Sequence, residues 1–269
     1  MKIHDQLNRI IHVDDTPKRI ISLVPSQTEL LCDLGLEEGI VGITKFCIHP
    51  KHLKNKITVV GGTKQIDLSE IIKLQPDIIL CNKEENTKEI VEACEGICTV
   101  HVSDIFNISD SLEMIKQYGA IFNKEKEALI ITQNIEQEAS AFNDFMQNME
   151  SKKVAYFLWK TPWMVAANNT FINYLLKLNK FINAYEDKSR YPEVELNALK
   201  PDTSVELVLL SSEPYPFKTK HQKEIQVYYP NAKVLLVDGE FFSWYGSRLL
   251  NAFKYFKSLH LNLQNNQPD

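Results

Sequence analysis

The sequence predicts an α/β fold of two Rossmann-like lobes, each built on a parallel sheet, and three observations support this class. Apolar segments rich in β-branched residues alternate with segments of helical spacing in both halves of the chain. Residues 124–149 contain no glycine or proline, and they separate the halves with a predicted helix of roughly 40 Å, at about 1.5 Å per residue. The order of helix, Pro-Asp, apolar strand and polar loop occurs at residues 67–86 and again at residues 194–214.

Repeated strand–helix–strand units predict the domain organisation, because they build a parallel sheet with helices on both faces. We expect an N-terminal α/β lobe at residues 1–123, a connecting backbone helix at residues 124–149 and a C-terminal α/β lobe at residues 150–269. In such folds ligands bind at the carboxyl ends of the strands. The expected ligand site is therefore a cleft between the lobes, where the strand ends of both sheets face each other.

Capping and turn signals place the elements of the first half. Ser26 is predicted to cap the first helix, with Glu29 three residues later completing a capping box, and Gly35 ends that helix. Asp67 is predicted to cap a short helix that ends before Pro76. The predicted strands of this half lie at residues 19–24, 39–44, 57–62, 77–82 and 98–103.

The second half repeats the alternation of strands and helices after the long helix. Its predicted strands lie at residues 153–159, 204–212 and 232–239. Its predicted helices lie at residues 170–178, 193–201 and 247–261.

Composition excludes several classes of partner. The chain has 269 residues, a formal net charge of −5 and an isoelectric point near 5.9. Nucleic acids and anionic membranes bind basic surfaces, so neither is the expected partner. No segment approaches the roughly 20 apolar residues of a membrane span.

The cysteines and the first residues predict a cytoplasmic location. Five scattered cysteines do not suggest a disulfide framework and favour a reducing compartment. The opening residues 1–13 are too polar for the apolar core of a secretory signal. A periplasmic location is the alternative if a leader has been removed.

The loops that follow the predicted strands hold all three tryptophans, Trp159, Trp163 and Trp244. Residues 237–250 are unusual because Phe241, Phe242, Trp244 and Tyr245 crowd behind an Asp-Gly turn. These rings either form a core wedge and a packed seam between the lobes, or line a pocket for a large flat ligand.

Signatures of catalysis are absent, so no catalytic residue is predicted. The chain lacks the G-x-S-x-G of a serine nucleophile, and residues 61–64 lack the spacing of a phosphate-binding loop. Gly61 and Gly62 more simply let the backbone turn and approach a ligand. Cys47 and His49 are weak candidates for metal ligands, with a structural or capping role as the alternative.

Several motifs taken together resemble a known family. They are PKRIISLVPSQTELLCDLGL, VGITKFCIHP, VVGGTK with DLSEIIKLQPDIIL, NKEENTKEIVEAC, YFLWKTPWMV, RYPEVEL, LVLLSSEPYPF and VDGEFFSWYGSR. In this order they resemble the helical-backbone metal receptors of the TroA-like superfamily. These are the class III periplasmic substrate-binding proteins of bacterial ABC importers for cobalamin, haem and iron–siderophore complexes. The resemblance covers nearly the whole chain and is nearest to the cobalamin-binding-like branch.

The resemblance implies that aromatic and polar loops of both lobes grip a planar macrocycle. Arg248 is expected either to hold a carboxylate or amide edge of the ligand, or to pair with Asp238 or Glu240. The other implied ligand contacts are Pro25, Ser26, Lys45, Phe46, Gly62, Thr63, Trp163, Phe242, Trp244 and Tyr245.

Two departures from the family pattern affect partner and pocket. Members of the family dock onto a permease through one glutamate in each lobe, whereas the matching positions here are Ser69 and Val194. Glu70 and Glu195 follow directly, but a neighbouring helical residue points elsewhere. Thr63 replaces a large aromatic side chain, which implies a remodelled pocket.

The sequence thus predicts a monomeric substrate-binding protein, not an enzyme, that captures a corrinoid or a related metal–tetrapyrrole and contains no intrinsic cofactor. The first alternative is a receptor for a ferric siderophore or metal ion. It is favoured by cationic side chains, namely Lys45, Lys64, Lys160 and Arg190. The second alternative is a cytosolic protein that handles or chemically alters a metal–tetrapyrrole without docking to a permease, with Cys47, His49 and Glu193 as reacting groups.

Overall fold

The computed structural model describes residues 1–196 and 202–265, which form two compact units. Unit 1 comprises Met1–Gln137 together with Trp244–Leu250. Unit 2 comprises Glu138–Ser243 and Asn251–Asp269. The chain therefore returns to unit 1 for a short segment late in the sequence, whereas the sequence analysis had placed this segment in the C-terminal lobe.

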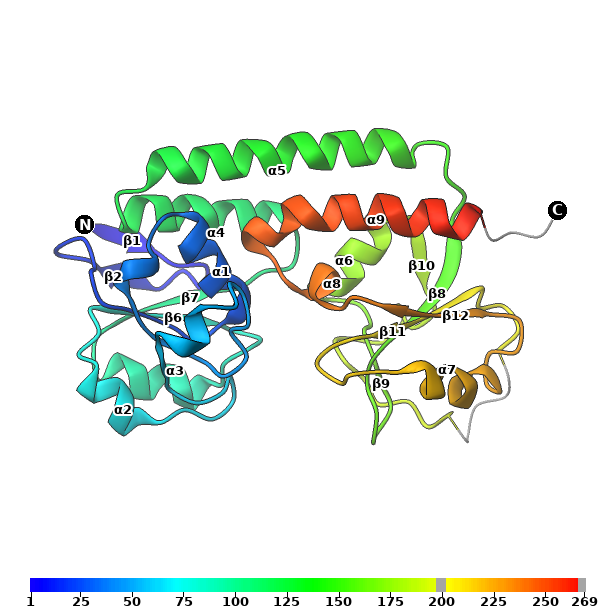
Figure 1. The fold of residues 1–269 in the computed structure, drawn as a ribbon, viewed down its shortest axis with the longest axis horizontal. Coiled ribbons are helices and arrows are strands. Elements are labelled where there is room, and N and C mark those ends of the chain that lie inside the picture. Colours follow the sequence, from blue (N-terminus) through cyan, green and yellow to red (C-terminus); the bar gives the residue numbers. More distant parts are fainter. Residues whose placement is uncertain (197–201, 266–269) are drawn as a thin grey trace. The chain divides into compact units, whose positions relative to one another are not determined.

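Unit 1 is built on a five-stranded parallel sheet (Figure 1). Its strands, in spatial order, are β5 (Thr58–Val59), β4 (Ile40–Ile43), β3 (Ile20–Ser22), β6 (Ile78–Asn82) and β7 (Thr99–Ser103). Ile79 pairs with Ile21 on one side and Val100 on the other, and all three side chains join one buried apolar cluster. A small antiparallel hairpin, β1 (Lys2–His4) with β2 (Ile10–His12), precedes the sheet.

The helices of unit 1 begin and end where the chain has capping and turn residues. Asp67 accepts a hydrogen bond from the Glu70 amide and caps α2, as predicted. Gly35 follows α1 with φ +75°, a conformation that glycine adopts readily. The helices are α1 (Pro25–Asp33), α2 (Leu68–Lys73), α3 (Lys88–Glu95) and α4 (Ile108–Ile121), with single turns η1 (Glu37–Gly39), η2 (Leu53–Asn55) and η4 (Gly246–Arg248).

Unit 2 contains a second parallel sheet, with one antiparallel strand added beside β8. The parallel strands, in spatial order, are β10 (Phe181–Asn183), β8 (Lys152–Trp159), β11 (Leu207–Ser211) and β12 (Lys233–Val237), and β9 (Met164–Val165) pairs with β8. The helices are α6 (Phe171–Leu178), α7 (Thr219–Gln226), α8 (Glu240–Ser243) and α9 (Leu249–Gln264).

The long helix α5 (Glu125–Met146) matches the predicted backbone helix. In unit 2, Phe142 of α5 packs against Phe253 and Phe256 of α9 at ring-centre distances of 5.8 and 5.9 Å. Figure 1 shows α9 running beside α5. The predicted fold class, an α/β protein of two lobes with parallel sheets and a long helix, is confirmed. No helix within the described ranges is long and apolar enough to span a bilayer.

Two local predictions failed in the described residues, the cap of α1 and the start of a helix at residues 193–201. Ser26 does not cap α1, because Pro25 already occupies the first helical position and Val24 is the cap, with no capping box from Glu29. In the predicted helix at residues 193–201, Glu193 forms an isolated β-bridge with Met164 instead. The remaining part, residues 197–201, lies outside the described residues.

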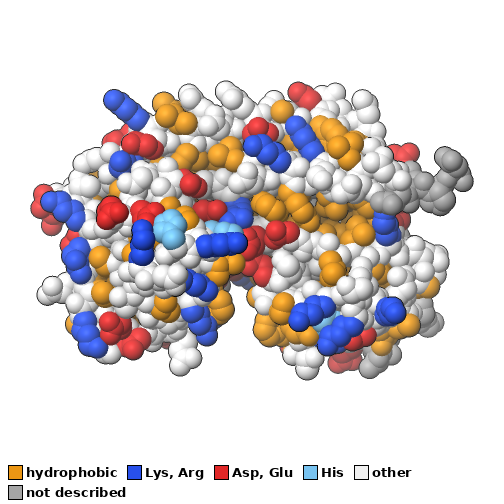
Figure 2. Space-filling model, viewed as in Figure 1, with side chains coloured by type: hydrophobic (Ala, Val, Ile, Leu, Met, Phe, Trp, Pro, Cys, Tyr) orange, Lys and Arg blue, Asp and Glu red, His pale blue; other side chains and the backbone are white. Residues whose placement is uncertain are grey.

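Charged side chains of both signs are interspersed on the face of the molecule shown in Figure 2.

Candidate ligand site

Unit 1 contains a hollow of about 780 Å³ at the carboxyl ends of β4 and β5. Its wall consists of Lys45, Phe46 and residues 61–68. The turn that shapes it depends on Gly61, which has φ +121° and whose missing Cβ would lie 2.5 Å from the Gln65 carbonyl oxygen. The Gly62 amide donates to that same oxygen at 2.7 Å. Only glycine therefore fits at position 61 without moving the turn.

Phe46 supplies an apolar surface at this hollow, since 48% of the residue is exposed. The ammonium group of Lys45 lies 5.1 Å from the centre of the Phe46 ring. A Cβ on Gly62 would lie 3.2 Å from the Phe46 ring, so the absence of a side chain at Gly62 leaves room beside that ring. An exposed ring beside bare backbone is suited to contact a flat ligand.

The loop after β6 is held rigidly next to the hollow by two buried asparagines. The Asn82 side-chain oxygen accepts hydrogen bonds from the amides of Glu84 and Glu85, at 2.9 and 3.1 Å. The Asn86 side-chain amide donates to the Thr63 carbonyl oxygen at 3.0 Å, and its side-chain oxygen accepts from the Asn82 amide at 2.9 Å. The loop after β6 and the turn after β5 are thereby joined.

Glu85 is a half-buried carboxyl group beside this wall. The Thr63 hydroxyl hydrogen-bonds its side chain, and the charges of Glu84 and Lys64 act on it with opposite signs. Burial is the largest effect and raises the pKa of Glu85 above its ordinary value. The sequence places Glu84 and Glu85 in a charged run after a strand, which is either a solvated helix N-terminus or a contact to polar ligand edges. Asn82 and Asn86 on either side of Glu85 are a signal of a structured loop.

The segment Trp244–Leu250 completes unit 1 through a buried polar network. Gln27 donates to the Tyr245 hydroxyl at 3.1 Å and accepts from the Tyr118 hydroxyl at 2.8 Å. The Gly246 amide donates to the Ser111 hydroxyl at 2.9 Å. Ser26 also hydrogen-bonds Tyr245, and burial raises the pKa of Tyr245, so its phenol stays protonated.

Arg248 anchors the same segment to α1. Its guanidinium donates to both carboxylate oxygens of Glu29 at 2.7 Å, a partner that the sequence analysis did not consider. The guanidinium also lies 4.9 Å from the centre of the Trp244 ring, and His49 approaches that ring edge-on at 5.6 Å. Burial raises the pKa of Glu29, while its hydrogen bond to Arg248 opposes this change.

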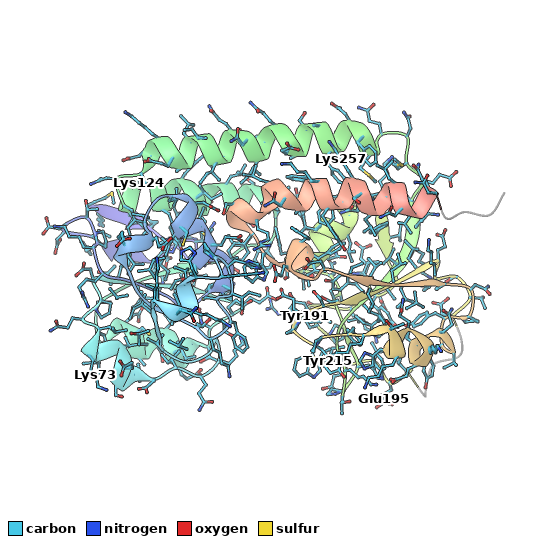
Figure 3. The ribbon with its side chains drawn as sticks, in the orientation of Figure 1. Lys73, Lys124, Tyr191, Glu195, Tyr215 and Lys257 are labelled. Atoms are coloured by element: carbon cyan, nitrogen blue, oxygen red, sulfur yellow. The ribbon has the colours of Figure 1, made fainter. Side chains whose placement is uncertain are left out.

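Unit 2 presents aromatic rings at the carboxyl ends of its strands. The half-buried Trp163 stacks on Phe217, with ring centres 5.7 Å apart and planes inclined by 17°. The ammonium group of Lys160 lies 5.2 Å from the Trp163 ring. Tyr215, labelled in Figure 3, packs against Phe217 at 4.8 Å and against Trp159 at 5.9 Å.

His221 packs against these rings, with ring-centre distances of 5.5 Å to Tyr215 and 5.4 Å to Phe217. Its Nδ1 accepts a hydrogen bond from the Lys218 amide at 2.8 Å, so the ring proton is on Nε2, which faces the Tyr215 hydroxyl at 3.4 Å. Desolvation lowers the pKa of His221 and favours this neutral form.

Phe242 belongs to the core of unit 2. Its side chain is fully buried, with ring-centre distances of 5.2 Å to Tyr156 and 4.9 Å to Phe256. It has no exposed surface for a ligand, which corrects its assignment as a ligand contact. Its neighbours Trp244 and Tyr245 belong to unit 1.

The weak metal candidates do not form a metal centre. Cys47 is buried, and its thiol lies 3.1 Å from the Thr28 hydroxyl and 3.3 Å from the Thr44 hydroxyl. Burial raises the pKa of Cys47, so the thiol stays protonated and is a poor metal ligand. Within the part of the chain that the structure describes, no group of three or more His, Cys, Asp or Glu side chains is placed to hold a metal ion.

The expected contacts of unit 1 fall into three groups. Trp244, Tyr245 and Arg248 lie in the late segment, where all three are buried. Lys45, Phe46, Gly62 and Thr63 lie together in the wall of the hollow. Pro25 and Ser26 form the first turn of α1, and both are buried.

Comparison with known families identifies the chain. The family described as "Periplasmic binding protein" matches residues 20–227. This chain belongs to that family. The substrate-binding lipoprotein YvrC of an ABC transporter from Bacillus subtilis is 26% identical over 76% of this chain and 68% of its own length. The vitamin B12-binding protein of Vibrio vulnificus is 25% identical over 76% of this chain and 72% of its own length.

Solved structures share the fold over nearly the whole chain. The periplasmic vitamin B12-binding protein BtuF of Vibrio cholerae has a TM-score of 0.77 at 17% identity, covering 94% of this chain and 99% of that one. The periplasmic haem-binding protein RhuT of Roseiflexus sp. RS-1, without ligand, also has a TM-score of 0.77, at 15% identity and with coverage of 92% and 98%.

These relatives overturn the prediction of a cytoplasmic location. The Bacillus relative is a lipoprotein and both solved structures are of periplasmic proteins, which points to a place outside the cytoplasm. Free cysteines were a poor guide to the compartment here. Cys47, Cys81 and Cys94 are buried, and burial raises the pKa of each, so the thiols are shielded and protonated without a reducing environment.

Proposed function

We propose that this protein is the substrate-binding component of an ABC importer and that it captures a corrinoid such as cobalamin. The observation that carries the proposal is the hollow of unit 1, where the exposed ring of Phe46 lies beside the bare backbone of Gly62. Trp163 of unit 2 supplies a second apolar surface. The vitamin B12-binding relatives support the same ligand class.

The chemistry of these surfaces favours reversible binding over catalysis. Stacking against rings buries apolar area at low entropic cost, and it leaves the ligand unchanged. The Cys47 thiol, one of the groups suggested for a reaction, is buried, and burial raises its pKa and favours the protonated form.

The partner in this proposal is a permease that docks without the usual pair of glutamates. Ser69 is exposed on α2, and its hydroxyl donates to Asp67 at 2.7 Å. Val194 is buried in the core of unit 2, so it cannot take part in docking. Glu195 is exposed and is labelled in Figure 3. Glu70 pairs with Lys73 at 2.9 Å, which leaves both charges at the surface of α2.

Absorbance titration tests the ligand. Cyanocobalamin added to the protein should give a saturable change in corrin absorbance, and Phe46→Ala and Trp163→Ala should each weaken it by about tenfold or more. Leu129→Ala is the matched control, because it also removes an exposed apolar side chain, on α5, and should leave binding unchanged. Equal affinity in all four proteins, or no absorbance change, would contradict the proposal.

A ferric chelate or haem is the second candidate, because the ammonium groups of Lys45 and Lys64 line the hollow. A competition experiment against bound cyanocobalamin distinguishes a corrinoid from a ferric chelate or haem as the ligand. If haemin or a ferric siderophore displaces cyanocobalamin at lower concentration than unlabelled cobalamin does, the second candidate is correct.

A further inference from the structure

The charges around the hollow of unit 1 are mixed rather than uniformly basic. Lys45 and Lys64 line it, but so does Asp67, and Glu84 and Glu85 follow in the adjoining loop. The Lys64 ammonium already donates to the Glu84 carbonyl oxygen at 2.5 Å. Such a wall does not favour a ligand of high negative charge.

Glu85 is held in place by hydrogen bonds and, unlike the exposed Asp67 and Lys64, it is half-buried. Its amide is bound by the Asn82 side chain at 3.1 Å, and its carboxyl group is bound by the Thr63 hydroxyl. Asn86 ties Thr63 to the same loop at 3.0 Å. A carboxyl group that is held in this way contributes directional hydrogen bonds and loses little side-chain entropy on binding.

We propose that Glu85 determines the ligand class at the site, by accepting hydrogen bonds from N–H groups on the edge of the macrocycle. The inference rests on the proposed function and deepens it. The site then selects a corrinoid whose edge carries carboxamides over one that carries a carboxylate at the position facing Glu85.

The selection follows from the asymmetry between the two edges. A carboxamide N–H satisfies the carboxylate of Glu85 with a charge-assisted hydrogen bond. A ligand carboxylate in the same place offers no donor, and it places two like charges together in a half-buried site. Lys64 lies close enough to Glu85 to lower its pKa, but it is exposed, and its charge therefore compensates only partly.

The experiment compares cyanocobalamin with its monocarboxylate isomers, in each of which one peripheral amide is hydrolysed. Isothermal titration at pH 7.5 is carried out on the wild type, Glu85→Gln and Glu84→Gln. Wild type should bind at least one isomer about tenfold more weakly than cyanocobalamin, and Glu85→Gln should reduce that ratio to about twofold or less. Glu84→Gln removes the same charge one residue away and should keep the wild-type ratio.

Each result decides the matter. Equal ratios in wild type and Glu85→Gln, or an equal loss of affinity for every ligand in Glu85→Gln, would overturn the role of Glu85 and leave the corrinoid function intact. The same shift in Glu84→Gln would also overturn it, because it would show a general effect of charge. Absence of binding to every corrinoid by the wild type would overturn the proposed function together with this inference.

Discussion

The two units use the same architecture but present different chemistry at the ends of their strands. In unit 1, glycine turns and asparagine-locked loops form a polar hollow with one exposed ring. In unit 2, stacked rings around Trp163 dominate. In the proposed function we therefore expect aromatic rings, Phe46 of unit 1 and Trp163 of unit 2, to supply affinity and the fixed polar groups of unit 1 to supply selectivity.

The largest effect is expected where the late segment is anchored to unit 1. Arg248→Met leaves the half-buried Glu29 without its partner and should lower the free energy of unfolding by up to about 3–5 kcal/mol, measured by urea denaturation. Lys73→Met is the control, because it breaks the exposed ion pair with Glu70 and should have no measurable effect. Similar losses in both variants would show that burial of the Glu29–Arg248 pair is unimportant.

The glycine turn of unit 1 should be the next most sensitive feature. Gly61→Ala forces a Cβ toward the Gln65 carbonyl oxygen at φ +121° and should cost about 1–3 kcal/mol of stability. It should also weaken ligand binding, because the turn forms the wall of the hollow. Gly96→Ala adds the same methyl group where it meets only an ordinary contact of 3.4 Å, so its stability should stay near that of the wild type. If Gly61→Ala has the same unfolding midpoint as the wild type, the claim that a Cβ at position 61 strains the turn is wrong.

The comparison between the units is tested most sharply by separating affinity from selectivity. Trp163→Ala should weaken binding of cyanocobalamin and of its monocarboxylate isomers by the same factor, about tenfold or more, because stacking does not distinguish their edges. The measurement is parallel isothermal titration of the variant with each ligand. A change in the ratio of the affinities would place selectivity in unit 2 and break the proposed division.

The smallest expected effect is the change in stability caused by Glu85→Gln. Its pKa is raised by burial above the ordinary value of 4.5, so the folded state holds the proton more tightly than the unfolded state does. Above the raised pKa, the charged carboxylate therefore costs stability, and below pH 4.5 this cost disappears. Glu85→Gln should be slightly more stable than wild type at pH 7 and equal to it near pH 4, by thermal unfolding at both values. If Glu85→Gln gains more stability over the wild type at low pH than at pH 7, the direction of the pKa shift of Glu85 is wrong.

Local patterns were sufficient for the fold because they depend on neighbours in sequence. Alternating apolar runs predicted the strands of the unit 1 sheet and β8, β11 and β12 of unit 2, but not the short strands β9 and β10. The absence of glycine and proline predicted α5. The cap assigned to Ser26 failed because α1 begins two residues earlier than predicted, with Pro25 as its first residue and Val24 as its cap. Glu29 looked like part of that cap, but it is paired with a guanidinium 219 residues away, and no local pattern contains that information.

The candidate site shows the same limit. The resemblance pointed to Lys45, Phe46, Gly62 and Thr63, which do lie together. The resemblance could not separate Phe242 from Trp244, although they are only two residues apart. Phe242 lies in the core of unit 2, whereas Trp244 belongs to unit 1, because the chain passes from one unit to the other between them. The sequence offered Glu85 only as part of a charged run that could contact polar ligand edges. Its fixed position comes from Asn82, Asn86 and Thr63 together, a set that only the folded chain assembles.

The most direct test of the central claim is isothermal titration of the wild-type protein with cyanocobalamin. Strand-end loops that bind a corrinoid predict saturable heat, one ligand per chain and a Kd below about 10 µM. No heat at that concentration with cyanocobalamin, together with tight binding of a ferric siderophore or haemin, would contradict the claim.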